Sequence, residues 1–355
     1  MRDNRAWFWN PRILSGGNGL IRRWLLRSLV LPWLAALVSV PAAAQCTAYV
    51  PTHKSNSVAV IDTSVDRVVA VIPVQIQPLA VAITPNGAFA YVSNSGWVFG
   101  SNSVSVIATA SNTVVATIPV GRFPVGLAIA PNGAAAYVAN FNSNSVSVIS
   151  TATNTVTATV TVGNGPWGLA ITPNGARAYV TNLNSNSVSV INTATNAVVA
   201  TVPVGTGPVA VAITPNGASA YVTNGSSDNV SVISTATNSV VATVPIVNGS
   251  YGSGPYAVAI TPNGAFAYVA NAAASAVSVI NTATNAVVAA VPVGTVPHGV
   301  AITPDGAFAY VGNEYSSTVS VINTATNTVV DTVTGVAVAP EGVAIKRQSN
   351  AVTCR

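Results

Sequence analysis

The chain has 355 residues, of which 50% are hydrophobic and only 6% are charged, and its formal net charge is +5. The excess of positive charge lies in the first 27 residues, with six arginines and one aspartate; from Gln45 onward there are seven basic and seven acidic residues. A formally neutral body has no basic stripe to neutralise phosphates, so the composition excludes nucleic acid as an expected partner.

Residues 1–44 have the pattern of an export signal. A cationic stretch is followed by 13 mostly apolar residues, SLVLPWLAALVSV, and this run is shorter than the roughly 20 residues that a membrane span needs. The small residues of PAAAQ suit cleavage near Ala44. Arg22 and Arg23 resemble a twin-arginine signal, but Ile21 stands where Ser or Thr is usual, so general secretion is an equal alternative. We expect a mature chain without a transmembrane segment, in the periplasm, at the cell surface or secreted.

The body of the chain repeats a unit of about 42 residues marked by an Ala-Tyr-Val triplet. The tyrosines of the triplets are spaced by 42 to 47 residues and are Tyr49, Tyr91, Tyr137, Tyr179, Tyr221, Tyr268 and Tyr310. Each unit holds four strand-like runs in which Val alternates with Ser or Thr. The Asn-Gly of TPNG predicts a tight turn between the first two strands. Four short strands per unit, without helical periodicity, predict an all-β protein built as a β-propeller.

Seven copies of each strand predict seven four-stranded antiparallel blades in residues 45–355. The repeats begin at a second strand, Ala48–Val50, and end with a lone first strand, Gly342–Lys346. We therefore expect the C-terminal strand to become the innermost strand of the N-terminal blade, blade 1, and so to close the ring. Cys46 and Cys354 flank this seam, and in an exported protein they are expected to form a disulfide; two unpaired thiols are the alternative.

The repeats resemble the YVTN family of β-propeller repeats, which occurs in surface-layer and periplasmic proteins. The resemblance rests on YVTN itself, at Tyr179–Asn182 and Tyr221–Asn224, and on the strings SVSVINTATN, VVATVPVG and TPNG. It covers the chain from about Thr47 to Lys346 and implies a fold shared with quinoprotein dehydrogenase-like propellers. It implies no particular activity, because the family is defined by a repeat and not by a site.

Insertions and unusual aromatic residues are confined to loops that belong to one face of the predicted ring. These loops join strands 2 and 3 of a blade or lead from one blade into the next, and their extra aromatic residues are Trp97, Phe99, Phe123, Phe141, Trp167, Tyr251, Tyr256 and Tyr315. Apolar rings in exposed loops predict a partner, and Trp, Tyr and Arg dominate interface energies. The expected binding residues are therefore Trp97, Phe99, Arg122, Phe123, Phe141, Trp167 and Tyr256. The equal alternative is an inserted loop that folds back, with Trp97 covering Phe123 and Trp167.

One residue in each blade, directly after the proline that begins the first strand, varies strongly between blades. These seven mouth residues are expected to ring the opening of the central channel and are Leu79, Val125, Trp167, Val209, Tyr256, His298 and Glu341. His53 and Glu314 belong to the loops between strands 2 and 3 of blades 1 and 7. The candidate metal ligands are therefore His53, His298, Glu314 and Glu341, and the candidate catalytic residues are His298, Glu341 and His53. A surface cluster without chemistry is the alternative, since terminal repeats are atypical in any repeat protein.

Two classes of function follow from these patterns. The leading hypothesis is a monomeric, non-catalytic binding protein that recognises a protein or glycan at the cell envelope and needs no cofactor. The alternative is a metal-assisted lactonase- or lyase-like enzyme that uses a divalent ion at the channel mouth. The scarcity of titratable side chains and the absence of any familiar catalytic motif favour the first hypothesis. A quinone-type cofactor is suggested by family analogy alone.

Overall fold

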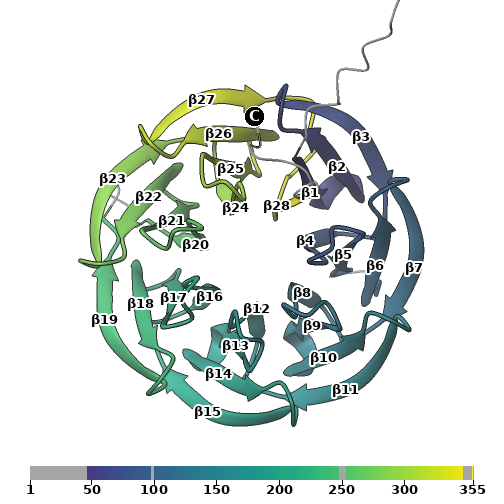
Figure 1. Cartoon of the computed structure of the whole chain (residues 1–355), viewed down its shortest axis with the longest axis vertical. Helices are drawn as coiled ribbons and strands as arrows, with labels where there is room; N and C mark the ends of the chain where they lie inside the picture. The colour runs from purple at the N-terminus through teal and green to yellow at the C-terminus, as the bar shows by residue number, and fades with distance from the viewer. Residues whose placement is uncertain (1–45, 97–99, 248–252, 347–353, 355) are drawn as a thin grey trace, which may run out of the picture. The chain divides into compact units, whose positions relative to one another are not determined.

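The computed structural model describes residues 46–96, 100–247, 253–346 and 354, and all structural statements refer to these residues. They hold 28 strands in seven four-stranded antiparallel sheets, arranged as a ring in which each sheet is one blade (Figure 1). The predicted seven-bladed propeller is therefore confirmed. The predicted export signal, together with Trp97, Phe99 and Tyr251, lies outside the described residues.

The strands of each blade are given from the innermost to the outermost. Blade 1 is β28 (Ala344–Lys346), β1 (Thr47–Thr52), β2 (Ser57–Asp62) and β3 (Arg67–Pro73); blade 2 is β4 (Pro78–Ile83), β5 (Phe89–Asn94), β6 (Ser103–Ala108) and β7 (Thr113–Pro119); blade 3 is β8 (Pro124–Ile129), β9 (Ala135–Asn140), β10 (Ser145–Ser150) and β11 (Thr155–Thr161); blade 4 is β12 (Pro166–Ile171), β13 (Arg177–Asn182), β14 (Ser187–Asn192) and β15 (Ala197–Pro203). Blade 5 is β16 (Pro208–Ile213), β17 (Ser219–Asn224), β18 (Asn229–Ser234) and β19 (Ser239–Pro245); blade 6 is β20 (Pro255–Ile260), β21 (Phe266–Asn271), β22 (Ala276–Asn281) and β23 (Ala286–Pro292); blade 7 is β24 (Pro297–Ile302), β25 (Phe308–Asn313), β26 (Thr318–Asn323) and β27 (Thr328–Val333). Three single-turn 3-10 helices follow second strands, namely η1 (His53–Ser55), η2 (Phe141–Ser143) and η3 (Leu183–Ser185).

The core lies between adjacent blades. The second and third strands are buried on both faces because each blade is covered by a neighbour on either side. One such core joins Tyr137 and Val146 of blade 3 to Val180 and Ile191 of blade 4. Full burial of each Val or Ile side chain contributes about 1.5–3 kcal/mol, so the blades hold one another in place. The outermost strands face solvent on their outer side.

Each repeat tyrosine links its blade to the next through a hydrogen bond. The hydroxyl of Tyr179, for example, donates to Oδ1 of Asn238, which lies in the turn between the third and fourth strands of blade 5, at 2.7 Å. This asparagine has a φ of 51°, the left-handed conformation that Asn tolerates well. The other pairs are Tyr49–Asn112, Tyr91–Asn154, Tyr137–Asn196, Tyr221–Asn285, Tyr268–Asn327 and Tyr310–Asp66. Burial raises the pKa of Tyr49 and of Tyr268 to about 12, so both hydroxyls remain protonated donors.

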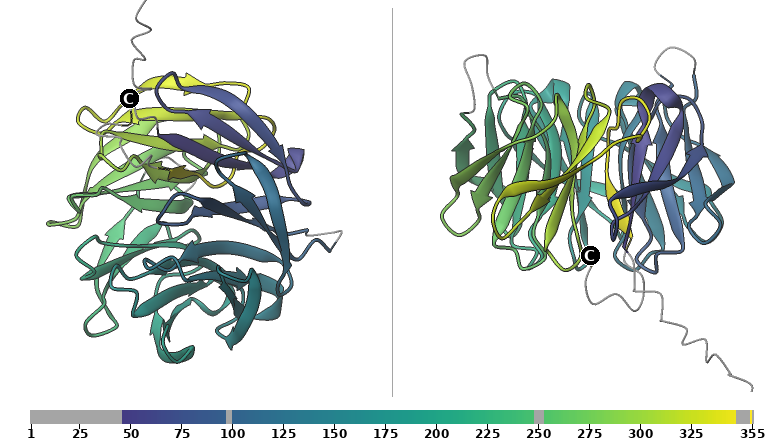
Figure 2. Two further views of the ribbon diagram at one scale, coloured as in Figure 1. Left: turned by 45° about the vertical axis from the view of Figure 1, so that its right-hand side comes forward. Right: turned by 90° about the horizontal axis from the view of Figure 1, so that it is seen from above.

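The ring is closed at blade 1 by the end of the chain. Strand β28 lies beside β1 (Figures 1 and 2) and pairs antiparallel with it, with Ala48 opposite Ile345. A disulfide joins Cys46 to Cys354, as predicted. The closing strand is shorter than predicted, since it begins at Ala344 and not at Gly342. Before it, the chain forms an isolated bridge between Pro340 and Thr52, and Ala337 and Ala339 of the same loop have left-handed φ values of 64° and 61°.

None of the described residues belongs to a helix that is long and apolar enough to cross a membrane.

Candidate functional site

The seven innermost strands surround the axis of the ring (Figure 1). In six blades the innermost strand begins with a proline, and the mouth residue follows it at once; His298 follows Pro297 in this way in β24. All seven mouth residues line one pocket of about 140 Å³, together with small residues such as Gly126 and Gly168. The predicted ring of variable side chains around the channel mouth is therefore confirmed.

Aromatic side chains form a continuous arc along one side of this pocket. The rings of Phe123, Phe141 and Trp167 lie edge to face, with centroids 5.5–6.4 Å apart. Trp167 continues to Tyr256 at 6.3 Å, and Tyr256 stacks on the imidazole of His298 at 4.1 Å with an interplanar angle of 10°. Edge-to-face pairs stabilise one another by about 0.5–1.5 kcal/mol beyond their burial, so the arc is a firm wall.

The arc unites features that the sequence analysis had assigned to two separate sites. Phe123 is only 4% exposed, so its ring packs against Trp167 and offers little surface for contact with a partner. Arg122 is exposed, and its backbone N–H donates a hydrogen bond to Oγ of Ser143 at 2.7 Å. Tyr315 is 69% exposed and lies apart from the arc. A binding role for these side chains stays a prediction.

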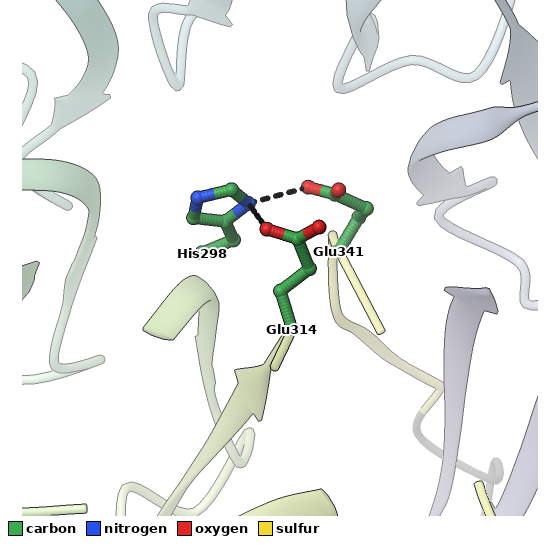
Figure 3. A group of neighbouring side chains, drawn as sticks. All are labelled: His298, Glu314 and Glu341. Atoms are coloured by element: carbon green, nitrogen blue, oxygen red, sulfur yellow. Dashed lines mark hydrogen bonds and ion pairs between the residues drawn. The ribbon is translucent and has the colours of Figure 1, made fainter. Parts of the chain in front are cut away.

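The arc ends at a group of one histidine and two glutamates. Nδ1 of His298 lies 2.8 Å from Oε2 of Glu341 and 3.6 Å from Oε2 of Glu314 (Figure 3). The three side chains are 16%, 9% and 12% exposed, so they are largely removed from bulk water. In Figure 3 the imidazole turns Nδ1 toward both carboxylates and its other nitrogen away from them.

The backbone of blades 7 and 1 brings this group together. A Cβ atom on Gly299 would collide with the carbonyl oxygen of Glu341, so glycine at this position lets the two segments approach closely. The backbone N–H of Glu341 donates to the carbonyl oxygen of Pro51 at 2.9 Å, which fixes Glu341 against β1. Glu314 directly follows β25, at the end where the strand reaches the mouth.

His53 is not part of this group. Among the described residues, those that can jointly hold a metal ion are His298, Glu314 and Glu341, and the ring nitrogen Nδ1 of His53 is buried without a hydrogen-bond partner there. The neighbouring Lys54 reaches the site instead, with Nζ 3.4 Å from Oε1 of Glu314 and 5.2 Å from the ring centre of Tyr315. Sequence reasoning missed Lys54, although it lies in the stretch YVPTHK where blade 1 departs from the repeat.

The electrostatics of the group are set by two carboxylates and one ammonium. Burial, and after it the charges of Glu341 and Glu314, raise the pKa of Tyr256, so its hydroxyl stays protonated. One imidazole nitrogen and one oxygen from each carboxylate lie within 4.8 Å of one another. Imidazole and carboxylate are ligands that catalytic zinc sites use, so this donor set fits a divalent ion. The same groups also suit proton transfer, since imidazole and carboxylate are common general acids and bases in proteins.

The fold and the pocket on its axis define a seven-bladed propeller with a pocket at the channel mouth. The chain belongs to the lactonase family of seven-bladed β-propellers, whose family model matches residues 47–157 and 170–346. No curated protein matches the chain significantly. The match shows the lactonase family and not the YVTN repeats as such, so the latter resemblance stays a prediction.

Several solved structures are similar to the chain. The hydrazine synthase of Kuenenia stuttgartiensis has a TM-score of 0.72 and 26% sequence identity, over 83% of this chain and 99% of that one. A protein of Bacteroides uniformis assigned as a 6-phosphogluconolactonase has a TM-score of 0.71 and 18% sequence identity, over 85% of this chain and 99% of that one. A protein of Bacteroides fragilis with the same assignment has a TM-score of 0.71 and 18% sequence identity, over 85% of this chain and 98% of that one. At 18% identity the two Bacteroides structures support the fold alone. The family match favours the enzyme hypothesis over the non-catalytic one.

Proposed function

We propose that the protein hydrolyses lactones at the channel mouth, with His298 and Glu341 as its acid–base pair. The observation that carries the proposal is the 2.8 Å contact between Nδ1 of His298 and Oε2 of Glu341 in a largely apolar pocket. Membership of the lactonase family supports the reaction class. The lyase-like reaction has no comparable support.

The carboxylate of Glu341 orients the imidazole. A carboxylate bonded to one ring nitrogen holds the proton there and leaves the other nitrogen as a proton acceptor. In His298 this places the proton on Nδ1 and leaves Nε2 to accept a proton from water. The stack on Tyr256 fixes the plane of the ring, so Nε2 keeps a constant direction.

The reaction balances with water as the only co-reactant. Water attacks the lactone carbonyl as Nε2 of His298 takes its proton, and a C–O bond forms. The ring C–O bond then breaks, and the proton passes from the imidazolium to the leaving alkoxide, which gives an open-chain hydroxy acid. A positioned base of this kind contributes about 10²–10⁴-fold to the rate.

Glu314 completes a donor set that would hold a divalent ion together with His298 and Glu341. Such an ion, when bound, would polarise the ester carbonyl or lower the pKa of a bound water. Lys54 lies 3.4 Å from Glu314 and neutralises part of the carboxylate charge. Because Nδ1 of His298 is the nitrogen that faces both carboxylates, it either carries the proton bonded to Glu341 or binds such an ion, and the two states exclude each other.

The test is lactone hydrolysis by the purified protein, followed as acid release, for the wild type and His298→Ala. His53→Ala is the matched control, since His53 belongs to the same face but not to the group. We expect His298→Ala to lose about 10²-fold or more of the rate and His53→Ala to keep it. Equal rates in wild type and His298→Ala would overturn the proposal. Metal content by mass spectrometry and the rate after chelation decide whether an ion takes part.

We also propose that the protein acts outside the cytoplasm, in the periplasm, at the cell surface or secreted. The disulfide between Cys46 and Cys354 supports this, because such bonds persist in oxidising compartments. Fractionation of cells that express the full chain tests it: mature protein that lacks residues 1–44 is expected in the periplasm or medium, and an uncleaved cytoplasmic protein would contradict it.

A further inference from the structure

We infer that the pocket selects an uncharged lactone with a single small ring and an apolar substituent, and that it discriminates against lactones that carry a phosphate. The inference rests on the proposed function and adds the class of substrate. Three independent properties of the site carry it: the size of the pocket, the chemistry of its walls and the sign of its charges.

The pocket has room for one small ring. Its volume is about 140 Å³, and an apolar cavity of about 150 Å³ accepts a molecule the size of benzene. A lactone ring of five or six atoms fits this space with its carbonyl at His298. Any substituent must then extend out of the pocket along the mouth.

The wall that a substituent would follow is apolar. Leu79, Val125 and Val209 line the pocket, and Val125 and Val209 are only 4% and 6% exposed. From His298 the aromatic arc runs through Tyr256 to Trp167 and on to Phe141. Each methylene of the substrate buried on such a surface strengthens binding about fourfold, so an alkyl chain is favoured over hydroxyl groups.

The charges near the reacting carbonyl are unfavourable to an anion. Of the described residues that line the pocket, none is Lys or Arg, and the charged one is Glu341. Glu314 adds a second carboxylate, and Lys54, which contacts it, is already paired with it. A phosphate on the substrate would stand close to two like charges, and at a separation near 6 Å each such pair weakens binding by about threefold in water and about a hundredfold in the lower dielectric near a protein surface.

Trp167 is the residue expected to decide the preference for the substituent. It lies between Phe141 and Tyr256 in the arc and lines the pocket, so it would contact the chain of the substrate and not its carbonyl. Shortening it to leucine removes part of the wall without touching His298 or Glu341. The expected effect is therefore a rise in KM that is much larger for substituted lactones than for unsubstituted ones.

The experiment compares kcat/KM of the purified protein on two matched pairs of lactones. The first pair is a γ-lactone with and without a pentyl chain, and the second is glucono-δ-lactone with and without a 6-phosphate. We expect the pentyl chain to raise kcat/KM at least about tenfold and the phosphate to lower it at least about tenfold. Trp167→Leu should remove most of the gain from the pentyl chain through KM, whereas Phe89→Leu, a partly exposed aromatic residue outside the pocket, should not.

A binding measurement separates this inference from the proposed function. Trp97 and Trp167 are the tryptophans of the chain from Gln45 onward. In a Trp97→Phe variant of the mature protein, Trp167 is therefore the remaining tryptophan, and its emission can be excited apart from that of the tyrosines. Its emission is titrated with the unreactive γ-lactam analogue that bears the pentyl chain and with an analogue that bears a phosphate in its place. Binding of the pentyl analogue without hydrolysis of any lactone would overturn the lactonase proposal and keep the pocket specificity. Equal or better use of the phosphorylated lactone, or tighter binding of the phosphorylated analogue, would overturn the inference.

Discussion

The two faces of the ring are built from the same repeat but have opposite roles. On one face the turns TPNG and NTATN keep a constant length, and the tyrosine–asparagine pairs that join neighbouring blades end there. On the other face the loops vary in length, and the mouth residues, the aromatic arc and the His298–Glu341 pair lie there. The comparison teaches that a repeat protein can separate stability from chemistry: the regular face holds the blades, so the other face is free to change.

The strongest test of this separation is Glu341→Gln. The variant keeps the shape of the side chain but no longer holds the proton on Nδ1 of His298 as a carboxylate does. We expect lactone hydrolysis to fall by about 10²-fold or more, with the unfolding midpoint nearly unchanged. Activity is measured by acid release and stability by urea unfolding. A large loss of stability with unchanged activity would show that the variable face also holds the ring together.

The seam is expected to matter most for stability. The double variant Cys46→Ala/Cys354→Ala removes a bond between residues 308 positions apart in the sequence. Loss of such a disulfide costs about 2–5 kcal/mol in free energy of unfolding, with the hydrolysis rate retained in the folded protein. Urea midpoints of both proteins, measured with and without reductant, check the contribution of the disulfide, since reductant should destabilise the wild type alone. Identical midpoints for both proteins would contradict it.

Gly299→Ala tests how closely blades 7 and 1 must approach at the mouth. The added Cβ collides with the carbonyl of Glu341, so the carboxylate shifts away from His298. We expect a loss of about 1–3 kcal/mol in stability, as for other overpacking substitutions, and a large loss of hydrolysis. The control is Ala257→Gly at the equivalent position of blade 6, which should leave hydrolysis intact. Unchanged hydrolysis in Gly299→Ala would show that the pair tolerates displacement.

A single link on the regular face should have a smaller effect. Tyr179→Phe removes the hydroxyl that bonds Asn238 at 2.7 Å and leaves the buried ring in place. One such hydrogen bond contributes about 0.5–1.5 kcal/mol, so stability falls by that amount and hydrolysis is unaffected. Tyr315→Phe, at an exposed tyrosine, is the matched control for urea unfolding. A drop in hydrolysis in Tyr179→Phe would couple the two faces and weaken the distinction between them.

The smallest effect is expected at Asp305, where the other blades with this turn have asparagine. Burial alone would raise the pKa of this carboxyl, but hydrogen bonds from Thr303 and from the backbone of Ala307 and Cys354 outweigh it and lower the pKa below 3.8. Because the folded pKa is the lower one, the stabilisation is present above about pH 4 and is lost as the pH falls through the folded pKa. Asp305→Asn should therefore be less stable than wild type at pH 6 and lose less stability on acidification. Parallel pH profiles of the urea midpoint for the two proteins would contradict this.

Prediction from the sequence succeeded where the repeat itself carried the information. The spacing of the Ala-Tyr-Val triplets determined seven blades, and the positions of the first and last strands determined the seam and its disulfide. The position after the first-strand proline identified seven of the 13 residues that line the pocket. The composition of the candidate metal-binding group was predicted in part, since His298, Glu314 and Glu341 come together and His53 does not.

Contacts between blades could not be read from the repeat. The 4.1 Å stack of Tyr256 on His298 joins blades 6 and 7. It connects the predicted aromatic binding residues with the predicted histidine and glutamates in one pocket. Lys54 of blade 1 reaches Glu314 of blade 7 across the boundary between these two blades. Such contacts depend on side-chain directions and on the closeness of neighbouring backbones, as at Gly299, and no spacing along the chain reports either.

The sequence by itself determined the strands, their number and the face on which variation is allowed, because these follow from local periodicity and from counting repeats. The tertiary structure alone decided which variable side chains meet, because closure of the ring brings the last blade against the first. The pairing of Nδ1 of His298 with Oε2 of Glu341, at 2.8 Å, arises at that junction. The candidate chemistry of this protein thus lies between β24 of blade 7 and the segment that leads into β28 of blade 1.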